Sequence, residues 1–415
     1  MEEEADGAGD AAARAGLGTN FWLLWTASTT SNLADGLLKV ALPLVTVTVS
    51  TSPVVVAGVA VALTLPWLVL ALPVGALVDR VDRRTAMVTA NVVRALGAGL
   101  VTAVALSSGA SLVSLYVAAV LIGTAETVHD TAAQAVLPQV VTRDQLSRAN
   151  GHLHAAELTA NEFVGPPLGG LLVALGAALA LAVPAATWSV AVGVLLLLRG
   201  RFHAAPAPAA GSIRSGVLTD IREGLSHLWR IPVLRRLAVT TGAFNLASNA
   251  TFTLFVLLAV GPTSELGLTG TGYGALLSCV AAGVLVGAVV AARVERLLGP
   301  ARAVVVGYCL GLVLFAVLAS SSHVGVIAAG FLAGGAGLGV YNVVAMSLRQ
   351  RITPDHLMGR MTSSYRLLAW GTRPVGAALG GSVGLALGLR AAFVLAGVVA
   401  LLGVIGPLRT HDREL

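Results

Sequence analysis

Charged side chains are scarce in this sequence of 415 residues, where Asp, Glu, Lys and Arg together make up 11%. Soluble globular domains contain about 25% of these residues, so the composition argues against a water-soluble enzyme. Cysteine is nearly absent, and because Cys279 and Cys309 both lie inside apolar runs, neither a disulfide framework nor a cysteine metal site is expected. Apolar residues are abundant, at 56%. That is enough for roughly ten to twelve membrane crossings of about 20 residues each, which predicts an all-α membrane protein.

A basic N-terminal segment is also lacking. Residues 1–18 are acidic, whereas a cleavable signal peptide begins with basic residues, so the first apolar run is expected to remain as a membrane helix. The net charge of +6 could suggest a nucleic-acid partner, but Lys and Arg are scattered between apolar runs instead of gathered on one face. No nucleotide-binding motif occurs in a suitable setting. We therefore expect no nucleic acid, no nucleotide and no cofactor.

Twelve apolar runs, bounded by charges, prolines or glycine clusters, predict twelve transmembrane helices in two sets of six. The runs lie near 21–48, 54–78, 86–107, 111–136, 150–176 and 180–198, and then near 237–260, 272–292, 303–320, 324–347, 361–386 and 391–408. Apolar residues at helical spacing over 217–228 predict an amphipathic helix on the membrane surface. The predicted domains are an N-terminal tail (1–18), a six-helix bundle (19–199), a linker (200–235), a second bundle (236–409) and a C-terminal tail (410–415).

The distribution of basic residues predicts the orientation. Cytoplasmic loops retain Lys and Arg, and if the N-terminus is inside, all but five of the 26 basic residues fall in inside segments. Four of the exceptions, Lys39, Arg94, Arg366 and Arg373, lie within spans, and Arg390 lies in an outside loop. Both termini, with the linker, are therefore expected in the cytoplasm.

The two sets of spans are related by an internal repeat. A shift of 211 residues aligns Gly165-Pro-Pro-Leu-Gly-Gly170 with Gly376-Ala-Ala-Leu-Gly-Gly381, and a shift of 212 aligns Gly75-Ala-Leu-Val with Gly287-Ala-Val-Val. A head-to-tail repeat of six spans gives two bundles of parallel topology, related by an axis along the membrane normal. Repeats of this kind enclose a central cavity.

The loop between the second and third spans carries the most specific motif. Gly75-Ala-Leu-Val-Asp79-Arg80-Val-Asp82-Arg83-Arg84 resembles the cytoplasmic loop signature of the major facilitator superfamily, Gly-x-x-x-Asp-Arg-x-Gly-Arg-Arg/Lys, with Asp82 where that family has Gly. The resemblance covers essentially the whole chain after Gly18. It implies the major facilitator fold, in which the Asp of this loop forms a latch against the eleventh helix.

The fifth span carries a second motif. Gly165-Pro166-Pro-Leu-Gly169-Gly170 resembles the antiporter signature of drug exporters, Gly-Pro-x-x-Gly-Gly. Proline interrupts the helical hydrogen-bond ladder and glycine allows close helix approach, so the segment suits a bending interface between the halves, with simple packing as the alternative. The segments 35–43, 125–134 and 148–150 resemble the drug:proton antiporters that include macrolide and siderophore exporters.

These resemblances imply a secondary active transporter, not an enzyme, in the plasma (bacterial inner) membrane. It would act as a monomer and export a hydrophobic or amphipathic small molecule in exchange for protons. A proton-coupled uptake symporter of the same fold is the alternative. A receptor or an intramembrane enzyme would need a soluble domain or a complete catalytic set, and the sequence offers neither.

Ionisable side chains inside the spans are few. A charge at bilayer depth costs at least about 2.5 to 3.5 kcal/mol, so each must face a partner or an aqueous cavity. The resemblance implies that spans one, four, seven and ten line this cavity. The candidates for proton coupling are Asp35, Glu126, Asp130, Glu157 and Glu162, their charge partners are Lys39, Arg94, Arg366 and Arg373, and the candidates for contact with substrate are Asn32, His129, Asn245, Asn249, Tyr341 and Asn342.

Structural roles compete with function at several of these positions. Lys39 lies four residues after Asp35, so an intrahelical ion pair and a coupling role are equally open for Asp35. Glu126 has no basic residue within one helical turn, which favours a role in proton or cation binding. Glu162 and Arg373 correspond under the shift of 211 residues and could form an ion pair between the halves. The Glu126-x-x-His129 spacing occurs in di-iron bundles, but such sites need two pairs, so no metal is expected.

Overall fold

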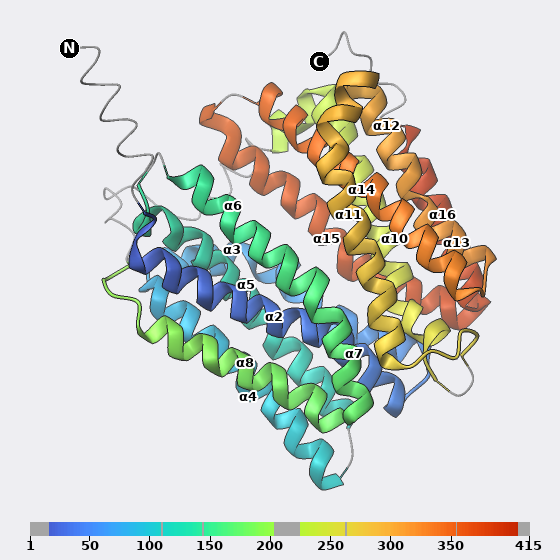
Figure 1. Cartoon of the computed structure of the whole chain (residues 1–415), viewed down its shortest axis with the longest axis horizontal. Helices are drawn as coiled ribbons and strands as arrows, with labels where there is room; N and C mark the ends of the chain where they lie inside the picture. The colour runs from blue at the N-terminus through green and yellow to red at the C-terminus, as the bar shows by residue number, and fades with distance from the viewer. Residues whose placement is uncertain are drawn as a thin grey trace.

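The computed structural model describes residues 16–108, 111–142, 145–202, 225–261, 264–353 and 355–405, which are almost entirely helical (Figure 1). The N-terminal half contains α2 (Gly18–Val49), α3 (Pro53–Val78), α4 (Arg83–Ser108), α5 (Leu112–Val140), α6 (Leu146–Glu157), the π-helix η1 (Leu158–Val164), α7 (Gly165–Leu175) and α8 (Ala177–Leu196). The C-terminal half contains α10 (Pro232–Ala259), α11 (Gly270–Leu298), α12 (Pro300–Gly311), α13 (Val313–Ser320), α14 (Val324–Ile352), α15 (Asp355–Leu387) and α16 (Leu389–Gly403). Most of the predicted amphipathic helix and nearly all of both predicted tails fall outside the described residues.

The helices confirm the predicted all-α membrane fold. Ten helical segments within the described residues are long and apolar enough to cross a membrane, and α16 is a shorter apolar helix. α15 is 33 residues long and coincides with the eleventh predicted span. Because α6, η1 and α7 run on as one crossing, and α12 and α13 as another, each of the twelve predicted spans corresponds to a described helix or helical series.

Proline and glycine define several helix ends. Pro53, Pro232 and Pro300 occupy the first turn of α3, α10 and α12, where an absent N–H breaks no helical hydrogen bond. Gly176 and Gly388 form the turns that follow α7 and α15, with φ values of 137° and 88°, a region that glycine enters without steric cost. These two turns hold corresponding places in the two halves, as the internal repeat predicts.

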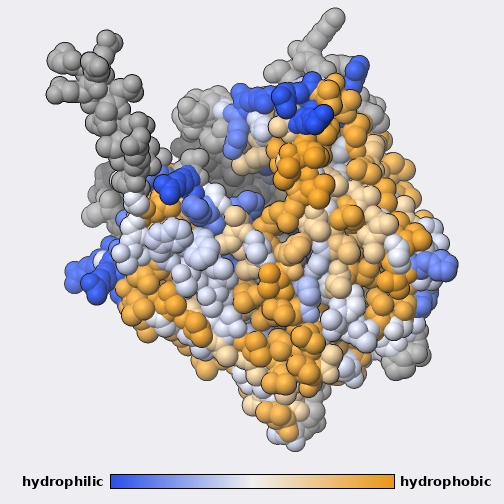
Figure 2. All heavy atoms as spheres, in the orientation of Figure 1, coloured by the Kyte–Doolittle hydropathy of each residue, from blue (hydrophilic) through white to orange (hydrophobic). Residues whose placement is uncertain are grey.

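Within each half the helices pack around buried apolar side chains, and the apolar cluster of the C-terminal half also includes Val40, Leu44 and Val56 of α2 and α3. In the N-terminal half α4 packs on α5 and α8, and α2 on α7 and α8; in the C-terminal half α11 packs on α14, and α10 on α15 and α16. Large apolar side chains also cover the outside, with Leu106 74% and Val289 83% exposed. Figure 2 shows these hydrophobic residues spread over the visible face. An apolar surface of this extent is expected of a protein surrounded by lipid.

The halves meet mainly along two glycine-containing contacts, between α7 and α11 and between α3 and α15. Gly170 of α7 lies against the backbone of Gly270 on α11, while Gly381 of α15 lies against Ala57 on α3. Gly170 and Gly381 are the residues that the 211-residue shift aligns, so both contacts follow the repeat. They lie at the beginning of α3 and α11 and towards the C-terminal ends of α7 and α15.

Candidate functional site

A buried arginine organises the polar cluster of the N-terminal half. The Arg94 side chain on α4 is 0% exposed, and its Nη1 lies 3.5 Å from Oδ2 of Asp35 on α2. The same nitrogen donates a hydrogen bond of 3.0 Å to Oγ of Ser31 and one of 3.4 Å to Oδ1 of Asn91. The guanidinium carbon lies 5.6 Å from the ring centroid of Trp188 on α8. The structure thus brings together two separately predicted charges, Asp35 and Arg94, as an ion pair between neighbouring helices.

The ion pair is unevenly exposed. Nε and Nη2 of Arg94 have no hydrogen-bond partner among the described residues, whereas the Asp35 side chain keeps 14% of its surface exposed. Removing one member of a buried pair leaves an uncompensated charge, which is strongly destabilising. Asp35 is therefore the counter-charge that stabilises Arg94 and also the member of the pair that water can reach.

The acids of α5 lie close to this pair. Glu126 is half-buried and lies within electrostatic reach of Arg94 and, across the gap between the halves, of Arg373. The His129 side chain is 3% exposed, and its Nδ1 lies 3.3 Å from Oδ1 of Asp130, whose side chain is 36% exposed. Since residues three and four apart share a helix face, Glu126, His129 and Asp130 form one ionisable surface next to the Asp35–Arg94 pair.

The facing wall of the C-terminal half contains a neutral hydrogen-bond cluster. Oγ1 of Thr241 on α10 lies 2.7 Å from the Tyr341 hydroxyl on α14 and 2.5 Å from the Tyr365 hydroxyl on α15. Asn245, one turn after Thr241, donates to the carbonyl of Ala369 at 2.7 Å. Tyr341 and Tyr365 are 2% and 5% exposed, so this cluster fixes the packing of three helices.

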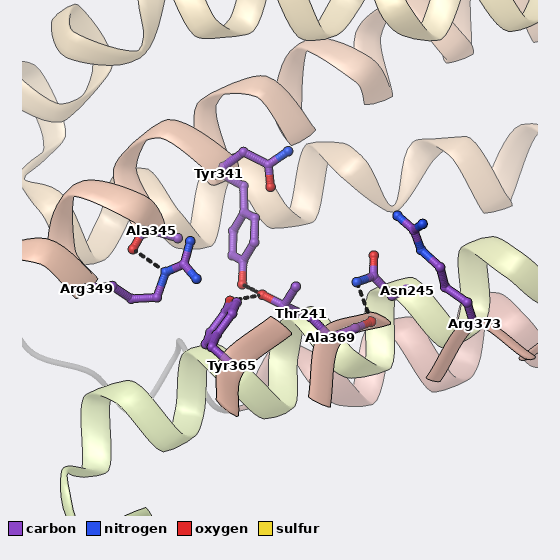
Figure 3. A pocket seen from close by; sticks show the side chains of 9 residues that line it. Thr241, Asn245, Tyr341, Ala345, Arg349, Tyr365, Ala369 and Arg373 are labelled. Atoms are coloured by element: carbon purple, nitrogen blue, oxygen red, sulfur yellow. Dashed lines mark hydrogen bonds between the residues drawn. The ribbon is translucent and has the colours of Figure 1, made fainter. Parts of the chain in front are cut away.

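A cavity of about 280 Å³ opens beside this cluster (Figure 3). Arg349 of α14 and Arg373 of α15 lie at its two ends, and the Arg349 guanidinium stacks on the Tyr365 ring, 3.8 Å from its centroid. The cavity is lined by Thr241, Asn245, Tyr341, Asn342, Ala345, Arg349, Tyr365, Ala369 and Arg373. It therefore combines two cations with hydroxyl and amide groups.

The remaining predicted residues lie in varied places. Asn32 is half-buried on α2, Lys39 is exposed on the same helix, and Asn249 donates to the carbonyl of Asn245 at 2.9 Å. Glu157 is exposed at the end of α6, where its carboxylate lies 3.4 Å from His154. The side chains of Glu162 and Arg366 lie outside those the structure describes, so their predicted pairing roles stay predictions.

Sequence reasoning missed the residues that complete both clusters. These are Ser31, Asn91 and Trp188 in the N-terminal half and Thr241, Arg349 and Tyr365 in the C-terminal half. A helical pattern could have revealed two of them, because Ser31 precedes Asp35 by four residues and Asn91 precedes Arg94 by three. No comparable signal in the sequence points to Trp188.

The loop motif at 75–84 forms hydrogen bonds to the C-terminal parts of α5 and α8. Arg83 donates to the carbonyl of Ala135 at 2.9 Å, and Arg84 to that of Leu195 at 2.9 Å, so both arginines bind carbonyls near helix C-termini, where cations are favoured. Asp82 accepts from the N–H of Thr85 at 2.9 Å, as an N-cap does. The family's glycine is thus replaced by a residue that caps α4.

The first acid of that loop stays on the surface. The Asp79 side chain is 70% exposed and lies 3.6 Å from Nη2 of Arg83, while Arg80 is exposed and Gly75 half-buried. The first residues of α15, against which the family's latch would form, have side chains outside the described ones. The latch therefore stays a prediction.

The motif at 165–170 is a packing surface on two sides. A Cβ at Gly165 would come within 2.6 Å of the Gly36 backbone on α2, and Gly169 lies against Leu37 on the same helix. Pro166 contacts Gly274 on α11 across the gap between the halves. The preceding π-helix η1 ends where the N–H of Gly165 donates to Ala160. The structure thus combines irregular backbone with close packing, the two features expected of a bending interface.

Comparisons with known proteins agree with this architecture. Residues 15–414 match the sequence profile of the family described as transmembrane secretion effector, of the major facilitator superfamily. A multidrug efflux pump named Tap from Mycolicibacterium fortuitum is 30% identical over 409 residues, which cover 95% of this chain and 96% of that protein. Within the described residues, no group of three His, Cys, Asp or Glu side chains could hold a metal ion.

Solved transporters share the fold. A mutant form of the nucleoside transporter NupG superposes with a TM-score of 0.73 at 10% identity, covering 94% of this chain and 99% of that one. A bacterial homologue of the iron transporter ferroportin in an inward-facing state superposes with a TM-score of 0.67 at 16% identity, covering 93% and 98%. At these identities the likeness concerns the fold alone.

Proposed function

Because the chain belongs to the transmembrane secretion effector family of the major facilitator superfamily, it is a multi-pass membrane transporter, and we propose that it exports amphipathic small molecules in exchange for protons. The relative Tap is named a multidrug efflux pump, which supports the export direction. The observation that carries the proposal of proton exchange is the cluster of accessible acids, Asp35, Glu126 and Asp130, around one buried arginine.

The proposed orientation would make this conformation the one that is open to the cytoplasm and closed to the outside. If both termini lie in the cytoplasm, as the distribution of basic residues predicts, the end of the molecule opposite the α7–α11 and α3–α15 contacts faces the cytoplasm of a bacterial cell. The glycine contacts of α7 with α11 and of α3 with α15 then seal the outer end. An exporter takes up its cargo in this state, and rocking of the halves about the central site would expose the same cavity to the outside.

The acids would couple cargo to protons by competition. A deprotonated Glu126 attracts a cationic or polar group of the cargo, and its protonation from outside removes that attraction and favours release. Asp35 would exchange its proton with water while Arg94 stays buried. At about 2.3 kcal/mol per charge per 100 mV, one proton driven by a total of roughly 150 mV supplies about 3.4 kcal/mol. That amount sustains a cargo gradient on the order of 300-fold.

Transport in proteoliposomes tests this proposal. An imposed pH gradient should drive a cationic dye against its own gradient and in the direction opposite to the protons. Glu126→Gln should abolish this coupled exchange, while downhill dye movement persists. Glu157→Gln is the matched control, because Glu157 is exposed at the end of α6 and away from the cluster. Unchanged coupled exchange in Glu126→Gln would remove this residue from the mechanism, and co-accumulation of dye and protons would establish the uptake symporter instead.

A further inference from the structure

The cavity between α10, α14 and α15 is smaller than a typical pocket for a whole drug-sized molecule. Its volume of about 280 Å³ lies just below the range of roughly 300 to 1,000 Å³ found for such pockets. It is a recess in one wall of the larger space between the halves, since its residue Arg373 lies within electrostatic reach of Glu126 on the opposite wall. The cavity therefore has the size of a subsite that holds one part of a cargo molecule.

The charges of this recess have one sign. Two of its nine lining residues are arginines and none is Asp or Glu. Arginine presents a planar fork of donors that matches carboxylate and phosphate oxygens. The recess thus favours an anionic group.

The arginine at one end is held in place before any cargo arrives. Nε of Arg349 donates to the carbonyl of Ala345 at 3.3 Å, Nη2 lies 3.1 Å from the Met346 sulfur, and the guanidinium stacks on the Tyr365 ring. The ring is fixed in turn by the hydrogen bond of its hydroxyl to Thr241. A cation fixed in this way loses little conformational freedom on binding, which favours affinity.

We infer that this recess binds an anionic oxygen group of the cargo, such as a carboxylate, an enolate or a phosphate. The inference rests on the proposed export function and narrows its substrate class. Because the opposite wall carries Glu126 and Asp130, the molecule that fits both walls is a zwitterion, with its anionic group at Arg349 and Arg373 and its cationic group toward the acids of α5. Arg349 and Arg373 are then determinants of specificity.

A matched pair of dyes tests the inference. A rhodamine with a free carboxylic acid and its methyl ester share one cationic ring system and differ in the anionic group. Binding of each dye to the purified full chain in detergent is followed by fluorescence anisotropy. Arg349→Gln and Arg373→Gln should each weaken binding of the acid at least about tenfold, the range of a charged hydrogen bond, and change binding of the ester less than about twofold.

The control variant is Arg296→Gln. Nε of Arg296 donates to the carbonyl of Ala292 at 3.3 Å, as Nε of Arg349 does to Ala345, but Arg296 lies on the last turn of α11 and outside the recess. This variant should bind both dyes as the wild type does. Retained binding of the ester shows that the other variants are folded. Equal losses for acid and ester, or no loss for either, would overturn the inference.

A further arm separates the two possible sources of the anion. If the recess holds a lipid phosphate instead of cargo, phosphatidylglycerol added to the micelles should displace the acid dye and leave the ester bound, and this result overturns the assignment to cargo. Binding in detergent needs no proton gradient. A selective loss of acid binding in a chain that shows no coupled transport would therefore support the recess while the export proposal fails.

Discussion

The two halves share a backbone plan but differ in the chemistry of their cavity walls. α2 and α10 end at Val49 and Ala259, and α5 and α14 begin at Leu112 and Val324. Residues therefore correspond at a shift of 210 between the first two helices and of 212 between the second two. Under these shifts three ionisable residues of the N-terminal half correspond to uncharged polar residues of the C-terminal half: Asp35 to Asn245, His129 to Tyr341 and Asp130 to Asn342. Ser31 corresponds to another hydroxyl residue, Thr241.

The comparison shows which properties the two halves have in common. Contacts between helices are matched, since Gly170 and Gly381 lie at corresponding places in the two interfaces. Ionisation is not matched, because the buried cluster of the N-terminal half contains an ion pair, whereas the buried cluster of the C-terminal half joins uncharged hydroxyl groups. Under the proposed function, proton exchange belongs to the first half and recognition of the cargo's anionic group to the second.

The largest expected effect comes from removing one member of the buried pair. Arg94→Met should lower the free energy of unfolding by about 3 to 5 kcal/mol, because Asp35 then lacks its counter-charge. In the hydrogen-bond cluster of the other half, Thr241→Val removes a partner that two tyrosines share and should cost about 1 kcal/mol. Chemical denaturation in detergent, followed by tryptophan fluorescence, measures both values.

A second substitution tests whether the uncompensated charge of Asp35 causes the loss of stability. Adding Asp35→Asn to Arg94→Met removes the uncompensated acid and should restore most of the lost stability without restoring proton coupling. Equal costs for Arg94→Met and Thr241→Val would contradict the distinction between a charged and an uncharged buried cluster.

An intermediate loss of stability and transport is expected for substitutions of Gly170 and Gly381, which correspond under the 211-residue shift. Gly170→Val and Gly381→Val both place atoms where the opposite half packs, against Gly270 in one case and Ala57 in the other. Overpacking of this kind costs about 1 to 3 kcal/mol, and since it opposes closure of that end, proteoliposome transport should fall about tenfold in each variant. Gly193→Val on α8 is the control, because nothing lies within 4 Å of its Cβ position. A large effect at one glycine alone would mean that the interfaces are not equivalent.

The sequence predicted the fold well and the site in part, for different physical reasons. Span positions follow from apolar length and bounding charges, which are local properties, so twelve runs sufficed to place the helices. The partner of Arg94 depends on how α2 and α4 meet. The sequence offered Lys39 as a local partner for Asp35, whereas the described ion pair of Asp35 joins it to Arg94 on another helix. Tyr365 and Arg349 were missed because an aromatic or basic residue near a helix end resembles an interfacial anchor until neighbouring helices are in place.

The smallest expected effect concerns a polar cluster around Arg390 in the C-terminal half, for which the described residues of the N-terminal half show no counterpart. Arg390, the basic residue predicted outside, donates to the Glu265 carboxylate, to Ser322 and to the carbonyl of Ser321. The residue that corresponds to Arg390 under the shift of 211 is Leu179, which is exposed. The hydrogen bond from Arg390 lowers the pKa of Glu265 below its usual value of 4.5, and the positive charge of Arg390 lowers it further.

A lowered carboxyl pKa stabilises the folded state at pH values above the unfolded pKa, and this contribution is lost as the pH falls through the folded pKa. Because the Glu265 side chain is 46% exposed, solvent screening limits the contribution to less than about 1 kcal/mol. Glu265→Gln should therefore lower the melting temperature slightly at pH 7 and leave the two proteins equally stable well below pH 4.5. Thermal unfolding across this range measures the difference. A difference that grows toward acid pH would show that the polar cluster around Arg390 does not depend on the ionised carboxylate, and this contrast between the two halves would disappear.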